Sequence, residues 1–138
     1  MFKLTFLTPE KKYFVDQEVD MVIVPAAYGE MQILAGHAPL ITTLSTGILR
    51  WKLKSEEQIR SFVISWGYCE VSPEGVTILA DIADQPADID VQKSQEEIKS
   101  GERRLANEFL NDVEWESVHR DIARARADLE LIGQKSPS

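Results

Sequence analysis

The periodicity of the apolar residues changes once along the chain, and this change limits the possible folds more than any other feature. From residue 2 to about residue 82, apolar and polar residues alternate over short runs, as in Phe2, Leu4 and Phe6. Turn-forming residues separate these runs about every 8–12 residues, a spacing typical of a β-sandwich or β-barrel. After Pro86 the alternation ends and the composition becomes that of helices. The expected turns include Asp16-Gln17, Tyr28-Gly29, Gly36-His37, Thr46-Gly47 and Trp66-Gly67.

The second half of the chain predicts two helices joined by a turn near residues 110–112. The first helix is expected to begin near Asp88 or Asp90, because acidic residues favour a helix N-terminus. Asn111 suits the N-cap of the second helix, and Glu114 follows it at the spacing of a capping box. Apolar residues at spacings of three and four place one apolar face on each helix. These faces are expected to comprise Val91, Ile98, Leu105 and Phe109, and then Trp115, Val118, Ile122, Ala125, Leu129 and Ile132.

The predicted helix pair carries too few apolar residues to be stable alone. Burying about ten side chains yields less free energy than ordering roughly 45 residues costs. We therefore expect the pair to rest on the sandwich or on another protein, and to be able to exchange between them. The predicted fold is an all-β sandwich over residues 1–86, followed by an antiparallel two-helix hairpin over residues 87–138, which makes the chain α+β overall.

Composition narrows the possible partners. The 138 residues include 23 acidic and 15 basic side chains, for a net charge of −8, which argues against binding to nucleic acid or anionic lipid. The single cysteine, Cys69, lies in an apolar strand pattern and is expected to be a buried thiol. The chain has neither a bilayer-spanning apolar run nor a signal-peptide pattern. We expect a protein without direct membrane insertion, either cytosolic or attached to a membrane complex through other proteins.

The sequence offers little support for catalysis or metal binding. The two histidines, His37 and His119, lie in different halves of the chain, and neither belongs to a metal-ligand motif. Ser45, His37 and Asp20 could form a catalytic trio only by chance, because the motif that presents a nucleophile is missing. We therefore expect no catalytic residue, no metal and no cofactor, and the chain is not predicted to be an enzyme.

Residues 29–40 read Gly-Glu-Met-Gln-Ile-Leu-Ala-Gly-His-Ala-Pro-Leu. This segment resembles the ε subunit of F-type rotary ATP synthases, whose usual pattern is Gly-Glu-Leu/Met-Gly-Ile-Leu-Pro-Gly-His-Ala-Pro-Leu. Gln32 and Ala35 depart from that pattern. Residues 62–71 are similar to the family's strand, Gly-rich turn and Glu-Val strand, and residues 76–81 to its last strand. The resemblance covers the whole chain and is strongest over residues 1–82.

The resemblance implies a non-catalytic rotor subunit of the central stalk. Such a subunit binds the γ subunit and the c-subunit ring through its sandwich, and it helps to couple proton or sodium flow to ATP synthesis. In the family, the Gly-Glu and Gly-His-Ala-Pro loops lie at the end of the sandwich that meets these partners. The implied location is peripheral, at the cytoplasmic face of the bacterial plasma membrane. The implied contacts are Glu30, Met31, Gln32 and His37, although on the residues alone His37 is equally well explained as a loop histidine bonded to a nearby carbonyl.

The arginines of the helical half form a second group. The resemblance implies that they bind an acidic segment of the catalytic β (and α) subunits when the hairpin extends, and that this blocks ATP hydrolysis. The alternative is a solvated helix surface, in which acids such as Asp121 and Asp128 form ion pairs with arginines one turn away. The arginines concerned are Arg103, Arg104, Arg120, Arg124 and Arg126.

Nucleotide sensing is an alternative function, as is binding of a small ligand inside the sandwich. Some bacterial relatives bind ATP through an Ile/Leu-Asp-x-x-Arg-Ala motif, which matches residues 89–94 here, with Lys93 and Ser94 in place of Arg and Ala. An ammonium lacks the bidentate fork of a guanidinium. Ser100 and Asp128 also occupy positions where ATP-binding relatives have arginines. The sequence therefore predicts weak or no ATP binding, with Asp84, Asp90, Lys93 and Arg124 as its candidate residues.

Overall fold

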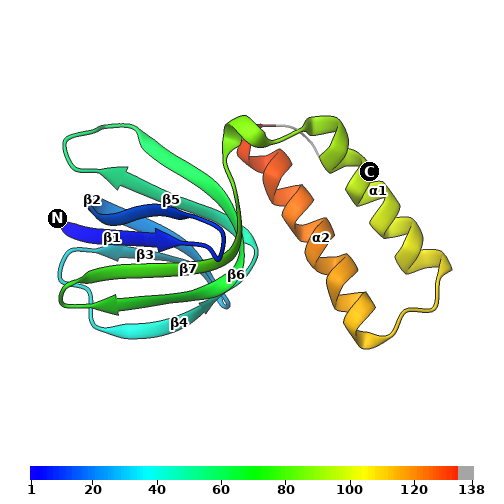
Figure 1. Ribbon diagram of the computed structural model, residues 1–138, viewed down its shortest axis with the longest axis horizontal. Helices are drawn as coiled ribbons and strands as arrows, with labels where there is room; N and C mark the ends of the chain where they lie inside the picture. The colour runs from blue at the N-terminus through cyan, green and yellow to red at the C-terminus, as the bar shows by residue number, and fades with distance from the viewer. Residues whose placement is uncertain (134–138) are drawn as a thin grey trace.

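Strands and helices occupy separate parts of the chain. The computed structural model describes residues 1–133, with the sandwich on the left of Figure 1 and the helix pair on the right. The last strand ends at Asp84 and the first long helix begins at Val91, while the predicted division at residue 86 stays a prediction. The elements are β1 (Phe2–Leu7), β2 (Lys12–Ala26), β3 (Gly29–Leu34), β4 (Leu40–Leu44), β5 (Gly47–Leu53), β6 (Ile59–Ser72), β7 (Gly75–Asp84), the 3₁₀ turn η1 (Pro86–Asp88), α1 (Val91–Asn107) and α2 (Asp112–Leu131).

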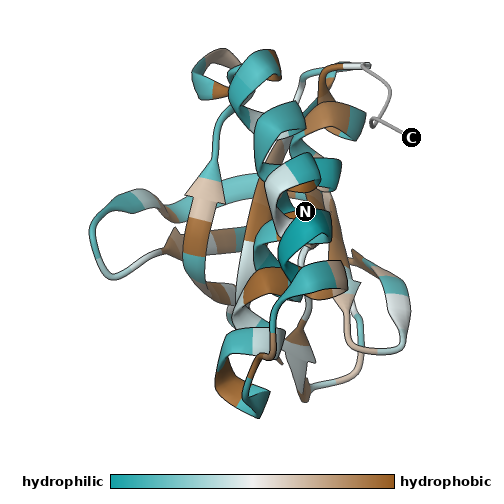
Figure 2. Cartoon of the chain, turned by 90° about the vertical axis from the view of Figure 1, so that its right-hand side faces the viewer, coloured by the Kyte–Doolittle hydropathy of each residue, from teal (hydrophilic) through white to brown (hydrophobic). Residues whose placement is uncertain are grey.

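The seven strands form a β-sandwich with an apolar interior, which confirms the predicted fold. The strand order is β1-β7-β6-β4-β2-β3; β5 pairs with both β2 and β6, and β1 lies parallel to β7 and antiparallel to β2. Brown and teal bands alternate along the strands in Figure 2, because neighbouring residues face opposite sides of a sheet. The interior cluster includes Leu4, Phe6, Val22, Ile33, Leu49, Trp51, Ile64, Cys69 and Ile78.

Two of the expected turns are wrong. Strand β2 continues through Asp16, which adopts a φ of 53° beside a shift in the register between β1 and β2. Strand β6 continues through Trp66 and Gly67, whose φ angles are 62° and 142°. Here β6 leaves its partner β5, at Ile64, and joins β4, at Gly67. The left-handed residues therefore bend continuous strands instead of ending them.

The helix pair has an apolar seam of its own, but its composition differs from the prediction. Phe109 lies beyond the end of α1, Trp115 lies in the first turn of α2, and both side chains are exposed. Ser94 and Gly101, which have no large apolar side chain, are buried where α1 meets α2. A Cβ atom on Gly101 would lie 2.7 Å from Cγ1 of Ile122, so the small residues allow close helix packing. The buried apolar residues of the seam are Ile98, Val118, Ile122, Ala125 and Leu129.

The helix pair rests on the outer surface of the sandwich through α2, as its thin seam predicts. Helix α2 contacts β5 and β6, and it is the helix nearer the strands in Figure 1. Ile48 and Val63 point outward from these strands and are buried by Ala127 and Leu131. This contact contains only four apolar residues, so it is small compared with the interior of the sandwich.

Replacing Gly67 with Ala is expected to destabilise the protein by about 3 kcal/mol or more. The new Cβ would lie 1.8 Å from the carbonyl oxygen of Leu79, and that backbone cannot move without breaking the sheet. Gly29→Ala is the matched control, because Gly29 also has a positive φ, of 126°, but has no neighbouring atom within 4 Å of the new Cβ. The control should lose only about 1–2 kcal/mol. Urea unfolding of both variants measures this, and equal losses would contradict the steric explanation.

Candidate functional site

An arginine–aspartate pair links the sandwich to the helix pair at their junction. Asp84 is the last residue of β7, and Arg124 projects from α2. The Arg124 guanidinium donates from Nε to Oδ2 of Asp84 over 2.7 Å, and from Nη2 to Oδ1 over 2.6 Å. The carboxylate side chain is only 15% exposed. Two parallel charge-assisted bonds fix both the distance and the orientation of the two elements.

Burial alone would raise the pKa of Asp84. The hydrogen bonds from Arg124, the neighbouring Asp128 carboxyl group, and the positive charges of Arg124 and Lys93 outweigh that effect, so the pKa lies below its ordinary value. Arg124 in turn has a raised pKa, mainly because it donates to Asp84. The pair therefore remains ionised at neutral pH.

Asp128 lies one helical turn after Arg124 and faces the same junction. Its side chain is buried, and its Oδ1 receives no hydrogen bond. Burial raises the pKa of Asp128 to about 8, and the neighbouring Asp84 carboxylate acts in the same direction. Arg124 is engaged with Asp84, so the predicted ion pair between Arg124 and Asp128 along the helix does not form.

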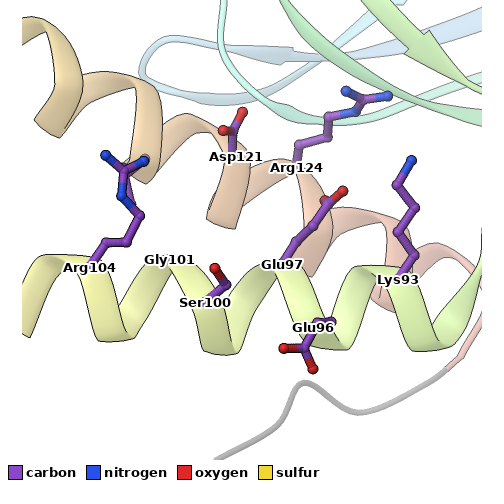
Figure 3. Close-up of a pocket in the computed structure, with 9 residues that line it drawn as sticks. Lys93, Glu96, Glu97, Ser100, Gly101, Arg104, Asp121 and Arg124 are labelled. Carbon is purple, nitrogen blue, oxygen red and sulfur yellow. The ribbon is translucent and has the colours of Figure 1, made fainter.

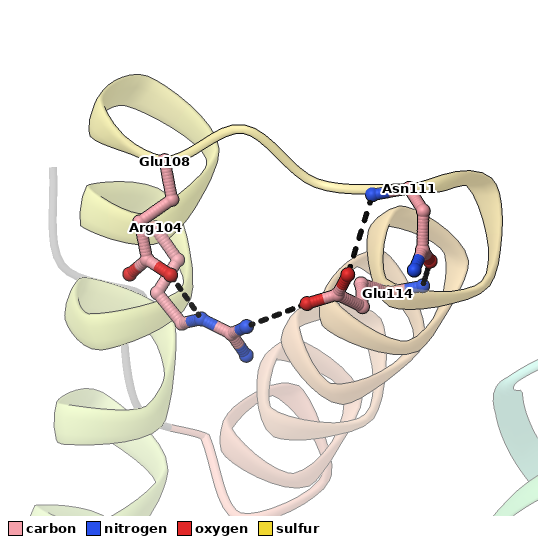
Figure 4. Close-up of polar contacts among 4 residues, drawn as sticks. All are labelled: Arg104, Glu108, Asn111 and Glu114. Carbon is pink, nitrogen blue, oxygen red and sulfur yellow. Dashed lines mark hydrogen bonds and ion pairs between the residues drawn. The ribbon is translucent and has the colours of Figure 1, made fainter.

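The other helical arginines also have partners within the chain. Arg104 binds Glu108 at 3.5 Å and Glu114 at 3.8 Å, and so bridges the end of α1 and the start of α2 in Figure 4. Asn111 and Glu114 form the predicted capping box beside it. The prediction of partners at Asp121 and Asp128 is therefore wrong for these arginines. The remaining contacts are Arg103 with Glu96, Arg126 with Glu102, and Arg120 over the ring of Trp66.

The structure brings together the four residues that the sequence marked for nucleotide binding. Asp84, Asp90, Lys93 and Arg124 line one cavity of about 90 Å³. Three further carboxyl groups, from Asp88, Glu97 and Asp128, line it as well. Five carboxyl groups against two cations give the cavity an acidic character, which disfavours a triphosphate.

A larger groove of about 530 Å³ runs between α1 and α2. Figure 3 shows Lys93, Glu97 and Arg104 on α1, facing Asp121 and Arg124 on α2. The side chain of Arg124 extends away from the groove toward the strands, where it binds Asp84. The arginine is thus occupied by the sandwich, and the groove mixes acidic with basic groups.

The proposed contacts with the stalk and ring do not lie together. Glu30, Met31 and Gln32 belong to β3, and Glu30 forms an ion pair with Arg50. His37 lies beyond the other end of β3, and its Nδ1 is 2.8 Å from the carbonyl oxygen of Ala38. A six-residue strand spans about 20 Å. The expectation that both loops share one end of the sandwich is therefore wrong, while the contact residues themselves stay a prediction.

The described residues contain neither a membrane-spanning helix nor a metal-binding cluster. No helix within residues 1–133 has the length and apolarity needed to cross a membrane. Over the same range, no three His, Cys, Asp or Glu side chains are grouped so that they could hold a metal ion. Cys69 is buried, as predicted, and burial raises the pKa of its thiol to about 12.

Sequence reasoning missed the outward-facing contact beneath α2. Ile48-Leu49 and Val63-Ile64 are adjacent apolar pairs, and alternation places the members of each pair on opposite faces of a strand. Such pairs indicate a strand that is covered on both faces. This signal was available in the sequence, whereas the stacking of Arg120 on Trp66 has no local signal.

Comparisons with known proteins agree with this architecture. Residues 1–86 match the family described as ATP synthase, Delta/Epsilon chain, beta-sandwich domain. The ATP synthase epsilon chain of Bdellovibrio bacteriovorus is 55% identical over 133 residues, which make up 96% of this chain and 95% of that protein. The chain belongs to the epsilon-chain family of F-type ATP synthases. Membership makes it a subunit of a complex devoted to ATP synthesis and ion transport.

Other relatives extend the match over both parts of the chain. The ATP synthase epsilon chain of Halalkalibacterium halodurans is 34% identical over 93% of this chain and 94% of that protein. A chain of the Euglena gracilis mitochondrial ATP synthase, solved as an OSCP/F1/c-ring assembly, superposes with a TM-score of 0.82 and 21% identity. The superposition covers 94% of this chain and 79% of that chain, and it shows a shared fold.

Replacing Arg124 with Met is expected to destabilise the protein by about 1.5–3 kcal/mol, because it leaves the buried Asp84 carboxylate without its partner. Arg126→Met is the matched control on the same helix, since the Arg126–Glu102 pair is largely exposed. The control should lose less than about 1 kcal/mol. Urea unfolding followed by the helical circular dichroism signal measures both changes. Equal effects would show that the junction does not depend on Arg124.

Proposed function

We propose that the chain is a non-catalytic subunit of the central stalk of ATP synthase. Its sandwich binds the γ subunit and the c-subunit ring, and thereby helps to couple proton translocation to ATP synthesis. Its helix pair inhibits ATP hydrolysis when it leaves the sandwich and reaches the catalytic head. Family membership supports the assignment to the complex, and the junction between sandwich and helix pair supports the regulatory role.

The observation that carries the regulatory role is the small contact between the two parts. Ile48, Val63, Ala127 and Leu131 provide its apolar portion, and the Arg124–Asp84 pair provides its polar portion. Because the interior of the sandwich does not include the helices, their departure leaves that interior intact. A partner then needs only a few kcal/mol of differential affinity to move the helix pair.

The helical arginines could bind acidic side chains of the catalytic head once the helix pair leaves the sandwich. Arg103, Arg104 and Arg126 form ion pairs on exposed helix surfaces, where such pairs contribute about 0–1 kcal/mol each. Exchanging these partners for acidic side chains of the catalytic β and α subunits therefore carries little penalty. Arg120 and Arg124 would become available only after undocking, because both face the sandwich. Charge pairs of this kind set register more than affinity.

The sandwich offers two separate surfaces for the stalk and the ring. Glu30, Met31 and Gln32 lie on β3, which pairs only with β2 among the described strands, and His37 lies in the loop that follows. Since they lie apart, we propose that one partner contacts the Glu30 end and that the other contacts the His37 end. The complex would hold the chain peripherally at the cytoplasmic face of a bacterial plasma membrane, in keeping with its bacterial relatives.

Truncation after Ala87 is expected to raise ATP hydrolysis by the reconstituted complex about fivefold or more, because inhibitory coupling of this kind is typically worth 1–3 kcal/mol. The assay compares complexes that contain the full or the truncated chain, at equal occupancy. Unchanged hydrolysis would remove the regulatory role and leave the coupling role intact. A pull-down of the γ subunit by the full and the truncated chain tests γ binding by the sandwich separately. Failure of the full chain to bind γ would overturn the stalk assignment.

Nucleotide sensing is the second candidate, favoured by the grouping of Asp84, Asp90, Lys93 and Arg124 around one cavity. The acidic lining and the engagement of Arg124 argue against a triphosphate. Titration calorimetry with Mg-ATP is expected to give a dissociation constant weaker than the low-millimolar range. A low-millimolar or tighter value would contradict this expectation, and Lys93→Ala would then show whether the predicted residues are responsible.

A further inference from the structure

We propose that the carboxyl groups of Asp84 and Asp128 share one proton when the helix pair is docked, and that this proton makes docking pH-dependent. Docking is tightest in acidic solution and weakens progressively as the pH rises. The idea extends the proposed movement of the helix pair, but it concerns docking alone and does not require that the released helices inhibit hydrolysis.

The geometry places an excess of carboxyl groups at the junction. Asp84 comes from β7, Asp128 and Arg124 come from α2, and all three line the cavity of about 90 Å³. One guanidinium shares this cavity with the two carboxyl groups, and its two bonds both go to Asp84. The other charged groups that face this cavity are Asp88 from η1, Asp90 before α1, and Lys93 and Glu97 from α1.

The burial of an unpaired carboxyl oxygen favours a proton on Asp128. Its Oδ1 is buried and receives no hydrogen bond, while the Asp84 carboxylate lines the same small cavity. Two ionised carboxylates would repel each other here, and only one is neutralised by Arg124. A protonated Asp128 can donate its O–H to Asp84, which satisfies both groups. On undocking, both carboxyl groups reach water and the proton is released to the solvent.

The direction of the effect follows from the two protonation equilibria. Burial and Asp84 raise the pKa of Asp128 to about 8 in the docked chain, whereas in water an aspartate has a pKa of about 3.9. Docking therefore binds a proton between these values and weakens about tenfold per pH unit as the pH rises through them. Above about pH 8 the dependence ends. Asp84 has a lowered pKa, so its stabilising contribution is present above about pH 4 and is lost only in more acidic solution.

Native-state hydrogen exchange of the α2 amides tests the proposal in the full chain. An undocked helix pair is only marginally stable, so these amides report its opening even when the open state is rare. After correction for the intrinsic exchange rate, the opening constant should increase about 50-fold between pH 6 and pH 8, because half of the docked Asp128 is already ionised at the upper limit. Asp128→Asn keeps a donor for Asp84 but cannot ionise, and it should abolish this increase. Asp121→Asn, an exposed acid on the same helix, should retain it.

Two outcomes overturn the proposal: an opening constant that does not change with pH, or an equal pH dependence in Asp128→Asn. Should Asp128→Asn fail to fold, the carboxyl carbon of Asp128 can be titrated by NMR in the unaltered chain. Titration above pH 7 supports the shared proton, and titration near the ordinary value excludes it. These measurements do not involve ATP hydrolysis. A failure of the pH-dependent docking can therefore be told apart from a failure of the proposed inhibition, which the truncation assay measures.

Discussion

The arrangement of this protein depends on two apolar side chains that face outward from a sandwich whose interior is already complete. Ile48 and Val63 would be exposed if α2 were absent, and α2 would expose Ala127 and Leu131. Each part therefore covers a small apolar area of the other, while neither contributes to the other's main cluster. This contact positions the helices on the sandwich, and it is small enough for a binding partner to displace, as proposed.

Polar groups at the junction make this contact specific. An apolar patch of four residues could slide or rotate, but the bidentate Arg124–Asp84 pair permits one register of α2 on the sheet. Buried ion pairs often add little net stability, because desolvation offsets their attraction. Their better-supported role is to select one arrangement among several of similar energy, and the junction has the features of such a device. Asp128 then makes that selection sensitive to a single proton.

Local sequence patterns predicted much of the fold, and the errors have physical causes. Alternation identified the strands, and Asp90, Asn111 and Glu114 marked the helix starts because capping is a local interaction. The sequence predicts a turn at Trp66, where the structure has a bend, because both require left-handed backbone. Small residues at the helix seam carry no hydropathy signal. The site was only partly predicted: four candidate residues do meet, but the contact of Asp84 with α2 joins residues 40 apart in sequence.

The turn between α1 and α2 is held by exposed ion pairs, which bears on how the helix pair could move as proposed. Arg104 bridges Glu108 and Glu114 across the turn, and these side chains are 41–52% exposed. Solvent competes effectively with such bonds, so the turn itself offers little resistance to straightening. Resistance comes instead from the interlocking of Gly101 with Ile122 further down the pair. In the proposed movement, the close approach of the helices at Gly101 and Ile122 therefore favours their moving together over their separating from each other.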